Sequence, residues 1–277
     1  YELEKRKYDR KLAIGSLAGA GNVALGSGAL TFGGNNADTI FSGVISGTGT
    51  ATKSGTGTMT LSGSNSYSGG TTVSAGVLQS GADDVLNDSG ALTMNSGGSY
   101  YLHTHSEAIG SLAGDGSVDL GAGALTTGGS NTDTTFSGVI SGTGSVAKEG
   151  AGTMVLSGAN SYSGGSTVNA GVLQSGADEV LADSGSLTVA GGSFDVNGHS
   201  ETAGNVTLAA GLLDDTVGGG LLTAATYDLQ SGQVNSALGS GALSKTTVVT
   251  VVLNAATSVS TVDITGGIMQ LDENEGI

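Results

Sequence analysis

The segment KSGTGTMTLSGSNSYSGGTTVSAGVLQSG, residues 53–81, decides how the rest of the sequence is interpreted, because it occurs more than once. It returns at residues 148–176 as KEGAGTMVLSGANSYSGGSTVNAGVLQSG, and a degenerate version follows at residues 245–270. Residues 41–82 align with residues 136–177 without a gap, at a spacing of 95 residues, and 33 of 42 positions are identical. Repetition of this kind indicates an array of similar structural units.

The repetition extends beyond this segment and divides the chain into four parts. Residues 1–13 form a densely charged leader or cap that resembles nothing after it. The first repeat unit is expected at residues 14–108 and the second at residues 109–202. A third, degenerate unit occupies residues 203–277. Since the chain begins with Tyr rather than Met, we expect a processed product or a fragment of a longer protein.

The composition argues against both an ordinary globular core and plain disorder. The 277 residues include 52 glycines but no proline, cysteine or tryptophan, and aromatic residues make up only 4%. The large side chains that usually fill a compact core are therefore scarce. Mean hydropathy is nevertheless slightly positive, and Val, Leu and Ile recur in short regular runs, whereas disordered chains have low hydrophobicity.

The charge distribution excludes several kinds of partner. Beyond residue 11 the chain has 3 basic and 21 acidic residues, a net charge of −18. Such a surface repels nucleic acid and anionic membranes. No apolar run reaches membrane-spanning length. The sequence therefore predicts no nucleic-acid partner and no direct membrane insertion of this segment.

Short alternating runs of apolar and polar residues, separated by Gly, Ser, Asn and Asp clusters, predict an all-β chain of strands and turns. An antiparallel sandwich or barrel is one arrangement of many short strands. A long, nearly gapless repeat with glycines at regular corners favours a parallel β-solenoid instead. Coils of roughly 20 residues predict about 13 coils and a rod on the order of 60 Å long.

Aliphatic residues are expected to stack inside the coils. In the first unit we expect Met59, Leu61, Val73, Val77 and Leu78 to point inward, and each buried aliphatic side chain contributes roughly 1.5–3 kcal/mol. The equivalent residues of the second unit are Met154, Leu156, Val168, Val172 and Leu173.

The repeated tyrosines, Tyr67 and Tyr162, are expected to cover a corner of the coil with the ring. Their hydroxyl groups would then reach water or the backbone.

Residues 55–79 and 150–174 resemble the autotransporter-associated β-strand repeat, which occurs in passenger domains of type V secreted proteins of Gram-negative bacteria. The pattern reads roughly G-x-G-x-(apolar)-x-L-x-G-x-N-x-Y-x-G-x-T-x-(apolar)-x-x-G-x-L. Its structural landmarks in this chain are Gly55, Gly57, Leu61, Tyr67, Gly69, Gly76, Leu78, Gly150, Gly152, Leu156, Tyr162, Gly164, Gly171 and Leu173.

The resemblance implies a right-handed parallel β-helix that is exported across the outer membrane and is displayed on the cell or released. Many members of the family act in adhesion, aggregation or biofilm formation. The repeat is a scaffold and secretion element and not a catalytic signature. A search for catalytic and metal-binding motifs finds none either, so we expect no catalytic residues, no metal site and no cofactor.

A direct search for chemistry gives three weak candidates, of which the acidic pairs come first. Asp83-Asp84, Asp178-Glu179 and Asp214-Asp215 would fit a polysaccharide-cleaving enzyme or adventitious calcium. The first two pairs recur at equivalent places in the repeat, so repeated solvated loops are the favoured interpretation.

Histidines and lysines supply the other two candidates. His103, His105 and Glu107 would share a strand face and could bind zinc. The second unit keeps His199 and Glu201 but has no counterpart of His103, and two ligands seldom make a zinc site. The single lysines of the units, Lys53, Lys148 and Lys245, could form a ladder for an anionic ligand. A charge beside each strand that resists edge pairing is the favoured interpretation.

The sequence thus predicts a non-catalytic scaffold or stalk of a bacterial adhesin-like passenger, at the cell surface or secreted. Self-association, or binding to carbohydrate or protein on a host or other surface, is the expected mode of action. A polysaccharide-cleaving β-helix enzyme and a purely structural extracellular filament segment are the alternatives.

Overall fold

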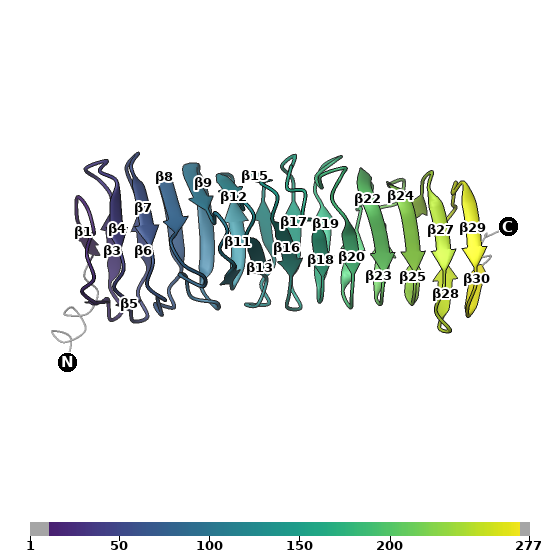
Figure 1. The fold of residues 1–277 in the computed structure, drawn as a ribbon, viewed down its shortest axis with the longest axis horizontal. Coiled ribbons are helices and arrows are strands. Elements are labelled where there is room, and N and C mark those ends of the chain that lie inside the picture. Colours follow the sequence, from purple (N-terminus) through teal and green to yellow (C-terminus); the bar gives the residue numbers. More distant parts are fainter. Residues whose placement is uncertain (1–10, 272–277) are drawn as a thin grey trace.

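The computed structural model describes residues 11–271, which form a rod of stacked coils (Figure 1). About 49% of the described residues are in strands, and the coils make a solenoid of about 13 turns. The paired strands run parallel, and no helix occurs among the described residues. The predicted parallel β-solenoid is confirmed, and the antiparallel alternative is wrong. Most of the predicted charged leader lies outside the described residues.

Each coil contributes one strand position to each of three faces, which run the length of the rod. Face 1 contains β1 (Lys11–Ala13), β3 (Ala29–Phe32), β6 (Ala51–Lys53), the first parts of β8 (Thr71–Ser80) and β9 (Ala91–Tyr101), β11 (Ser111–Gly114), β14 (Thr134–Phe136), β17 (Thr153–Leu156), β19 (Val172–Ser175), β21 (Ser193–Asp195), β23 (Leu212–Asp214), β25 (Gly232–Val234), β28 (Thr250–Leu253) and β30 (Ile268–Leu271).

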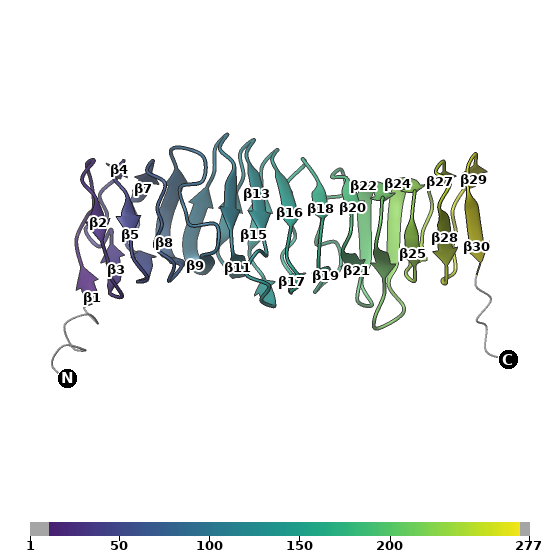
Figure 2. The same ribbon diagram turned by 90° about the horizontal axis from the view of Figure 1, so that it is seen from below.

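Face 2 contains β4 (Thr39–Phe41), β7 (Thr58–Leu61), the second parts of β8 and β9, β12 (Ser117–Asp119), β15 (Val139–Ser141), the first parts of β22 (Ser200–Leu208) and β24 (Leu221–Leu229), and β26 (Ala237–Leu238). Face 3 contains β2 (Val23–Ala24), β5 (Ile45–Ser46), β10 (Glu107–Ile109), β13 (Ala124–Thr127), β16 (Ser145–Lys148), β18 (Ser166–Val168), β20 (Leu187–Val189), the second parts of β22 and β24, β27 (Ala242–Lys245) and β29 (Thr261–Ile264). Figure 2 shows part of face 3 as the line β13, β16, β18 and β20.

The coil length agrees with the prediction. On face 1 the register pairs Leu30 with Ala51, then Ala51 with Thr71, Thr71 with Leu92, and Leu92 with Leu112. Successive partners are therefore 20 or 21 residues apart. Buried and more exposed positions alternate along strands such as β3, β7 and β17, as a pleated strand requires.

The length of the repeat is not a whole number of coils. Leu30 lies on face 1, but its counterpart Leu125 pairs with Glu107 on face 3. Likewise Ile40 pairs with Thr60 on face 2, whereas its counterpart Thr135 lies on face 1. A spacing of 95 residues thus equals four whole coils and two further faces. The second repeat is consequently turned by one face relative to the first.

The third unit returns to the orientation of the second. Lys148 pairs with Val168 on face 3, and the same face continues through β20, β22 and β24 to β27. Lys245 belongs to β27. The interval from Lys148 to Lys245 therefore contains five whole coils, so these two lysines share a face and Lys53, on face 1, does not.

Aliphatic side chains fill the interior as expected, with one pair of exceptions. Of the residues expected to point inward, eight are buried: Met59, Leu61, Val73, Leu78, Met154, Leu156, Val168 and Leu173. Val77 and Val172 are half-exposed. The prediction was wrong for these two because each directly precedes a buried leucine, and neighbouring residues in a strand point to opposite sides.

Two buried asparagines replace strands where a face is interrupted. The Asn65 side chain accepts a hydrogen bond from the Ile45 amide at 2.7 Å and donates to the Val85 carbonyl at 2.6 Å. Asn160 makes the equivalent bonds to Ile140 and Val180. Each side chain therefore joins the coils above and below where no strand does.

Candidate functional site

The rod surface is hollowed at two equivalent places. The hollow of the first unit has a volume of about 370 Å³, and that of the second unit about 390 Å³. We call them the β4 hollow and the β14 hollow, after the strand at the edge of each. The β4 hollow is lined by Asp38, Thr39, Ile40, Thr58 and Thr60. The β14 hollow is lined by Asp133, Thr134, Thr135, Thr153, Val155 and Gln174.

An aspartate is fixed at each hollow by the next coil. Asp38 Oδ1 accepts a hydrogen bond from the Thr58 amide at 2.6 Å, and Asp133 Oδ1 accepts one from the Thr153 amide at 2.8 Å. Both aspartates are exposed. Each carboxyl group is thus held in place by one oxygen, while the side chain remains accessible to solvent.

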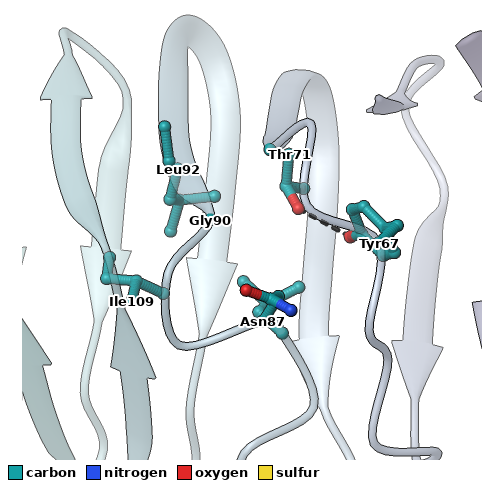
Figure 3. Close-up of a pocket in the computed structure, with 9 residues that line it drawn as sticks. Tyr67, Thr71, Asn87, Gly90, Leu92 and Ile109 are labelled. Carbon is teal, nitrogen blue, oxygen red and sulfur yellow. Dashed lines mark hydrogen bonds between the residues drawn. The ribbon is translucent and has the colours of Figure 1, made fainter. Parts of the chain in front are cut away.

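The space beneath Tyr67, drawn in Figure 3, is an interior gap between coils. Its lining includes Thr71, Leu92 and Ile109, and it leaves no room for a water molecule. The Tyr67 hydroxyl bonds to the Thr71 side chain at 2.6 Å, and Tyr162 makes the same contact with Ser166.

The expected position of these tyrosines is therefore corrected. Tyr67 and Tyr162 are only 1% exposed, and each hydroxyl reaches a side-chain hydroxyl instead of water or backbone. Burial raises the pKa of both phenols to about 12.

A buried glutamate holds the loop after β8. Glu107 Oε1 accepts the Leu86 amide at 2.9 Å, and Oε2 accepts the Val85 amide at 3.1 Å. The Tyr100 hydroxyl donates to Oε2 at 2.7 Å, and the Ser80 hydroxyl lies 3.5 Å from it. We call this arrangement the Glu107 clasp. Burial raises the pKa of Glu107 to about 7, against the effect of these donors.

The second unit repeats the arrangement as the Glu201 clasp. Glu201 accepts the amides of Val180 at 3.2 Å and Leu181 at 2.7 Å, together with the Ser175 hydroxyl at 3.1 Å. Burial raises its pKa to about 7 as well. Sequence inspection missed this role, although the same His-Ser-Glu triplet ends at Glu107 and at Glu201.

The first two acidic pairs lie in the loops that the Glu107 and Glu201 clasps hold, and they accept hydrogen bonds from backbone amides. Asp83 accepts the Ser106 amide and contacts His105 Nδ1 at 3.2 Å, and Asp178 bonds to Ser200 and His199 in the same way. These bonds lower the pKa of both aspartates.

The third pair also binds backbone and amide groups. Asp215 accepts hydrogen bonds from three backbone amides, and Asp214 accepts one from the side-chain amide of Asn235.

The expectation that His103, His105 and Glu107 share a strand face is wrong. His103 lies in a turn with φ of 62° and stacks on Tyr101 at 3.9 Å between ring centroids. His105 contacts Asp83 at the surface, whereas Glu107 points into the core. Within residues 11–271, no group of three or more potential metal-ligating side chains comes together.

The lysines are buried, which contradicts the favoured interpretation of a charge beside the strand. Lys53 and Lys148 are 1% exposed and Lys245 is 0% exposed. Lys53 Nζ donates to the carbonyls of Ser54, Gly55 and Ala75 at 2.9–3.1 Å. Burial lowers the pKa of Lys53 and Lys148.

The other two lysines are bound in a similar way. Lys148 donates to the carbonyls of Glu149, Gly150 and Ala170, and Lys245 donates to Thr247. The ammonium groups therefore bind the chain's own corners, which leaves no lysine ladder for an external anion.

The repeat landmarks are placed where coils bend or touch. Gly55, Gly76, Gly150 and Gly171 have φ between 62° and 69°, the left-handed region that favours glycine. Close contact constrains the other glycines: a Cβ at Gly57, Gly69, Gly152 or Gly164 would lie 2.4–2.6 Å from a carbonyl of the preceding coil. The landmark leucines are buried.

Comparison with known proteins agrees with this architecture. The sequence profile of the passenger-associated-transport repeat matches residues 52–79 and 146–174. The chain is 34% identical over 259 residues to the protein named Adhesin BmaC autotransporter from Brucella suis biovar 1 (strain 1330). That alignment covers 90% of this chain but only 7% of the relative, so the chain spans a small part of its relative's length. No solved structure matches.

In the part of the chain that the structure covers, no helix is long and apolar enough to cross a membrane.

Proposed function

Because the chain is a segment of an autotransporter passenger with passenger-associated-transport repeats, we propose that it serves as a non-catalytic adhesive stalk, displayed at the cell surface or secreted. Its relative is named an adhesin, which supports adhesion. The alternative of a structural filament segment would use the same rod without a binding surface.

The observation that carries the proposal is the separation of charge between the interior and the surface. Beyond residue 11, Lys53, Lys148 and Lys245 are the only lysines or arginines, and all three are buried. The polar side chains on the accessible surface of residues 12–271 are therefore carboxylates, hydroxyls and amides, with histidine as the basic group. Such a surface suits an uncharged, hydroxyl-rich target and repels anionic ones.

The same charge distribution governs self-association. Two rods with acidic surfaces repel each other at low ionic strength, and salt screens this repulsion within a Debye length of about 8 Å at physiological salt. Direct association of rods should therefore increase with salt, whereas attachment to an uncharged surface should depend little on it.

We expect display of residues 1–277 on a non-adherent bacterium to increase settling and attachment relative to an empty-display control. Titration with NaCl separates direct association from attachment, since only the former should rise steeply. Cells that behave like the control at every salt concentration would contradict an adhesive role and favour the structural filament.

A further inference from the structure

The two hollows face different directions. The β4 hollow lies on face 2, between β4 and β7, whereas the β14 hollow lies on face 1, between β14 and β17. This difference follows from the repeat length, which equals four coils and two further faces. With strands about 4.8 Å apart, the hollows are offset by roughly 22 Å along the rod.

The chemistry of the hollows matches a neutral glycan. Asp38 and Asp133 use Oδ1 to accept a backbone amide of the next coil, whereas Oδ2 makes no hydrogen bond within residues 11–271 and can accept one from a sugar hydroxyl. Threonine hydroxyls add donors and acceptors, and the methyl groups of Ile40 and Val155 offer apolar surface for the C–H face of a sugar ring. No basic side chain lines either hollow.

We propose that the β4 and β14 hollows are two subsites for neutral glycans, oriented so that one rod bridges two separate glycan chains. This inference rests on the proposed adhesive function and specifies its ligand class and geometry.

Two sites on one face would both bind along a single chain, with a high effective concentration for the second site. Sites on adjacent faces of a rod cannot both contact one extended chain that lies along the rod. Each site therefore binds a different chain. The turned repeat thereby favours cross-linking over tight adsorption to one chain.

The test uses beads coated separately with dextran, laminarin or hydroxyethyl cellulose, together with the intact 277-residue chain. Bead agglutination reports bridging, and retention of labelled protein on dilute beads reports binding. One variant alters the β4 hollow, Asp38→Asn with Thr58→Val, and the other alters the β14 hollow, Asp133→Asn with Thr153→Val. Asn keeps the acceptor for the backbone amide, which preserves the corner.

Thr52→Val and Thr167→Val serve as matched controls, because both threonines are half-exposed strand residues outside the hollows. We expect at least one coating to bind wild-type protein and to agglutinate. Each single-hollow variant should keep binding within about threefold but lose at least tenfold in agglutination, and the four-substitution variant should lose binding.

Several outcomes would overturn the inference. One is agglutination that both single-hollow variants retain. Another is a hundredfold loss of retention in either, which would mean that both hollows bind one bead together and that neither is free to reach a second bead. Absence of binding to all three coatings would also overturn it. If displayed cells still adhere in that case, the proposed function stands and only the glycan assignment fails; if they do not adhere, both fail.

Discussion

The two glutamate clasps perform the same task with different side chains. In both units a buried carboxylate accepts two consecutive loop amides, those of Val85 and Leu86 or those of Val180 and Leu181. The Glu107 clasp also has the Tyr100 hydroxyl, whereas buried Phe194 stands at the equivalent position of the Glu201 clasp.

In the second unit the serine hydroxyl moves closer instead. Ser175 lies 3.1 Å from Glu201, compared with 3.5 Å between Ser80 and Glu107. The comparison shows that the backbone amides are the constant requirement, and that the remaining donors can be exchanged.

Removal of the carboxylates should have the largest effect. Glu107→Ala and Glu201→Ala each leave two buried amides without an acceptor, at about 1–3 kcal/mol for each amide. We expect the greater loss for Glu107→Ala, because the Tyr100 hydroxyl also loses its contact with the carboxylate. Hydrogen exchange of the amides at residues 85–86 and 180–181 measures both effects.

Asp88→Ala is the matched control, since Asp88 is exposed on the same loop. Exchange at residues 85–86 that is unchanged by Glu107→Ala would show that the clasp does not hold the loop.

Acidity should affect both clasps in the same direction. The pKa of each glutamate is raised from 4.5 to about 7, so folding favours the protonated form. This stabilising contribution is complete below about pH 4.5 and is lost as the pH rises to about 7. Desolvation is the main cause, with like charge from Asp84 at Glu107 and from Glu179 at Glu201.

The check compares the thermal midpoints of wild type and of the Glu107→Gln, Glu201→Gln variant between pH 4.5 and 7. The wild-type midpoint should fall more steeply, while the general acidic repulsion affects both proteins alike. Parallel curves would show that the glutamates do not titrate in this range.

An exchange of the aromatic residues should have the smallest effect. Tyr100→Phe removes one donor to Glu107 and makes the first clasp resemble the second, at a cost of about 1.5–3 kcal/mol for a hydrogen bond to a charged group. Phe194→Tyr should make the reverse change and stabilise the second clasp, provided that Ser175 accommodates the hydroxyl. Urea denaturation midpoints measure both, and a Tyr100→Phe protein as stable as wild type would mean that the Ser80 hydroxyl replaces the phenol.

Much of the fold could be predicted from the repeat because its glycines, leucines and alternating residues depend on local geometry. The polar interior could not. Lys and Glu are residue types that normally lie at the surface. Only the closed coil places backbone carbonyls around Lys53 and backbone amides around Glu107. Val77 was misplaced for a related reason, since the apolar run from Val77 to Leu78 leaves the inward register ambiguous.

The sequence by itself determined that the first unit returns after 95 residues and that the chain stacks in parallel coils of about 20 residues. Only the tertiary structure decided on which face of the rod the equivalent residues of each repeat lie. Orientation depends on the number of strand positions between two copies, and corners of variable length hide that number in the sequence. Lys53 and Lys148 are 95 residues apart, and Lys148 therefore lies on a different face from Lys53. The interval from Lys148 to Lys245 is a whole number of coils, so these two lysines lie on the same face.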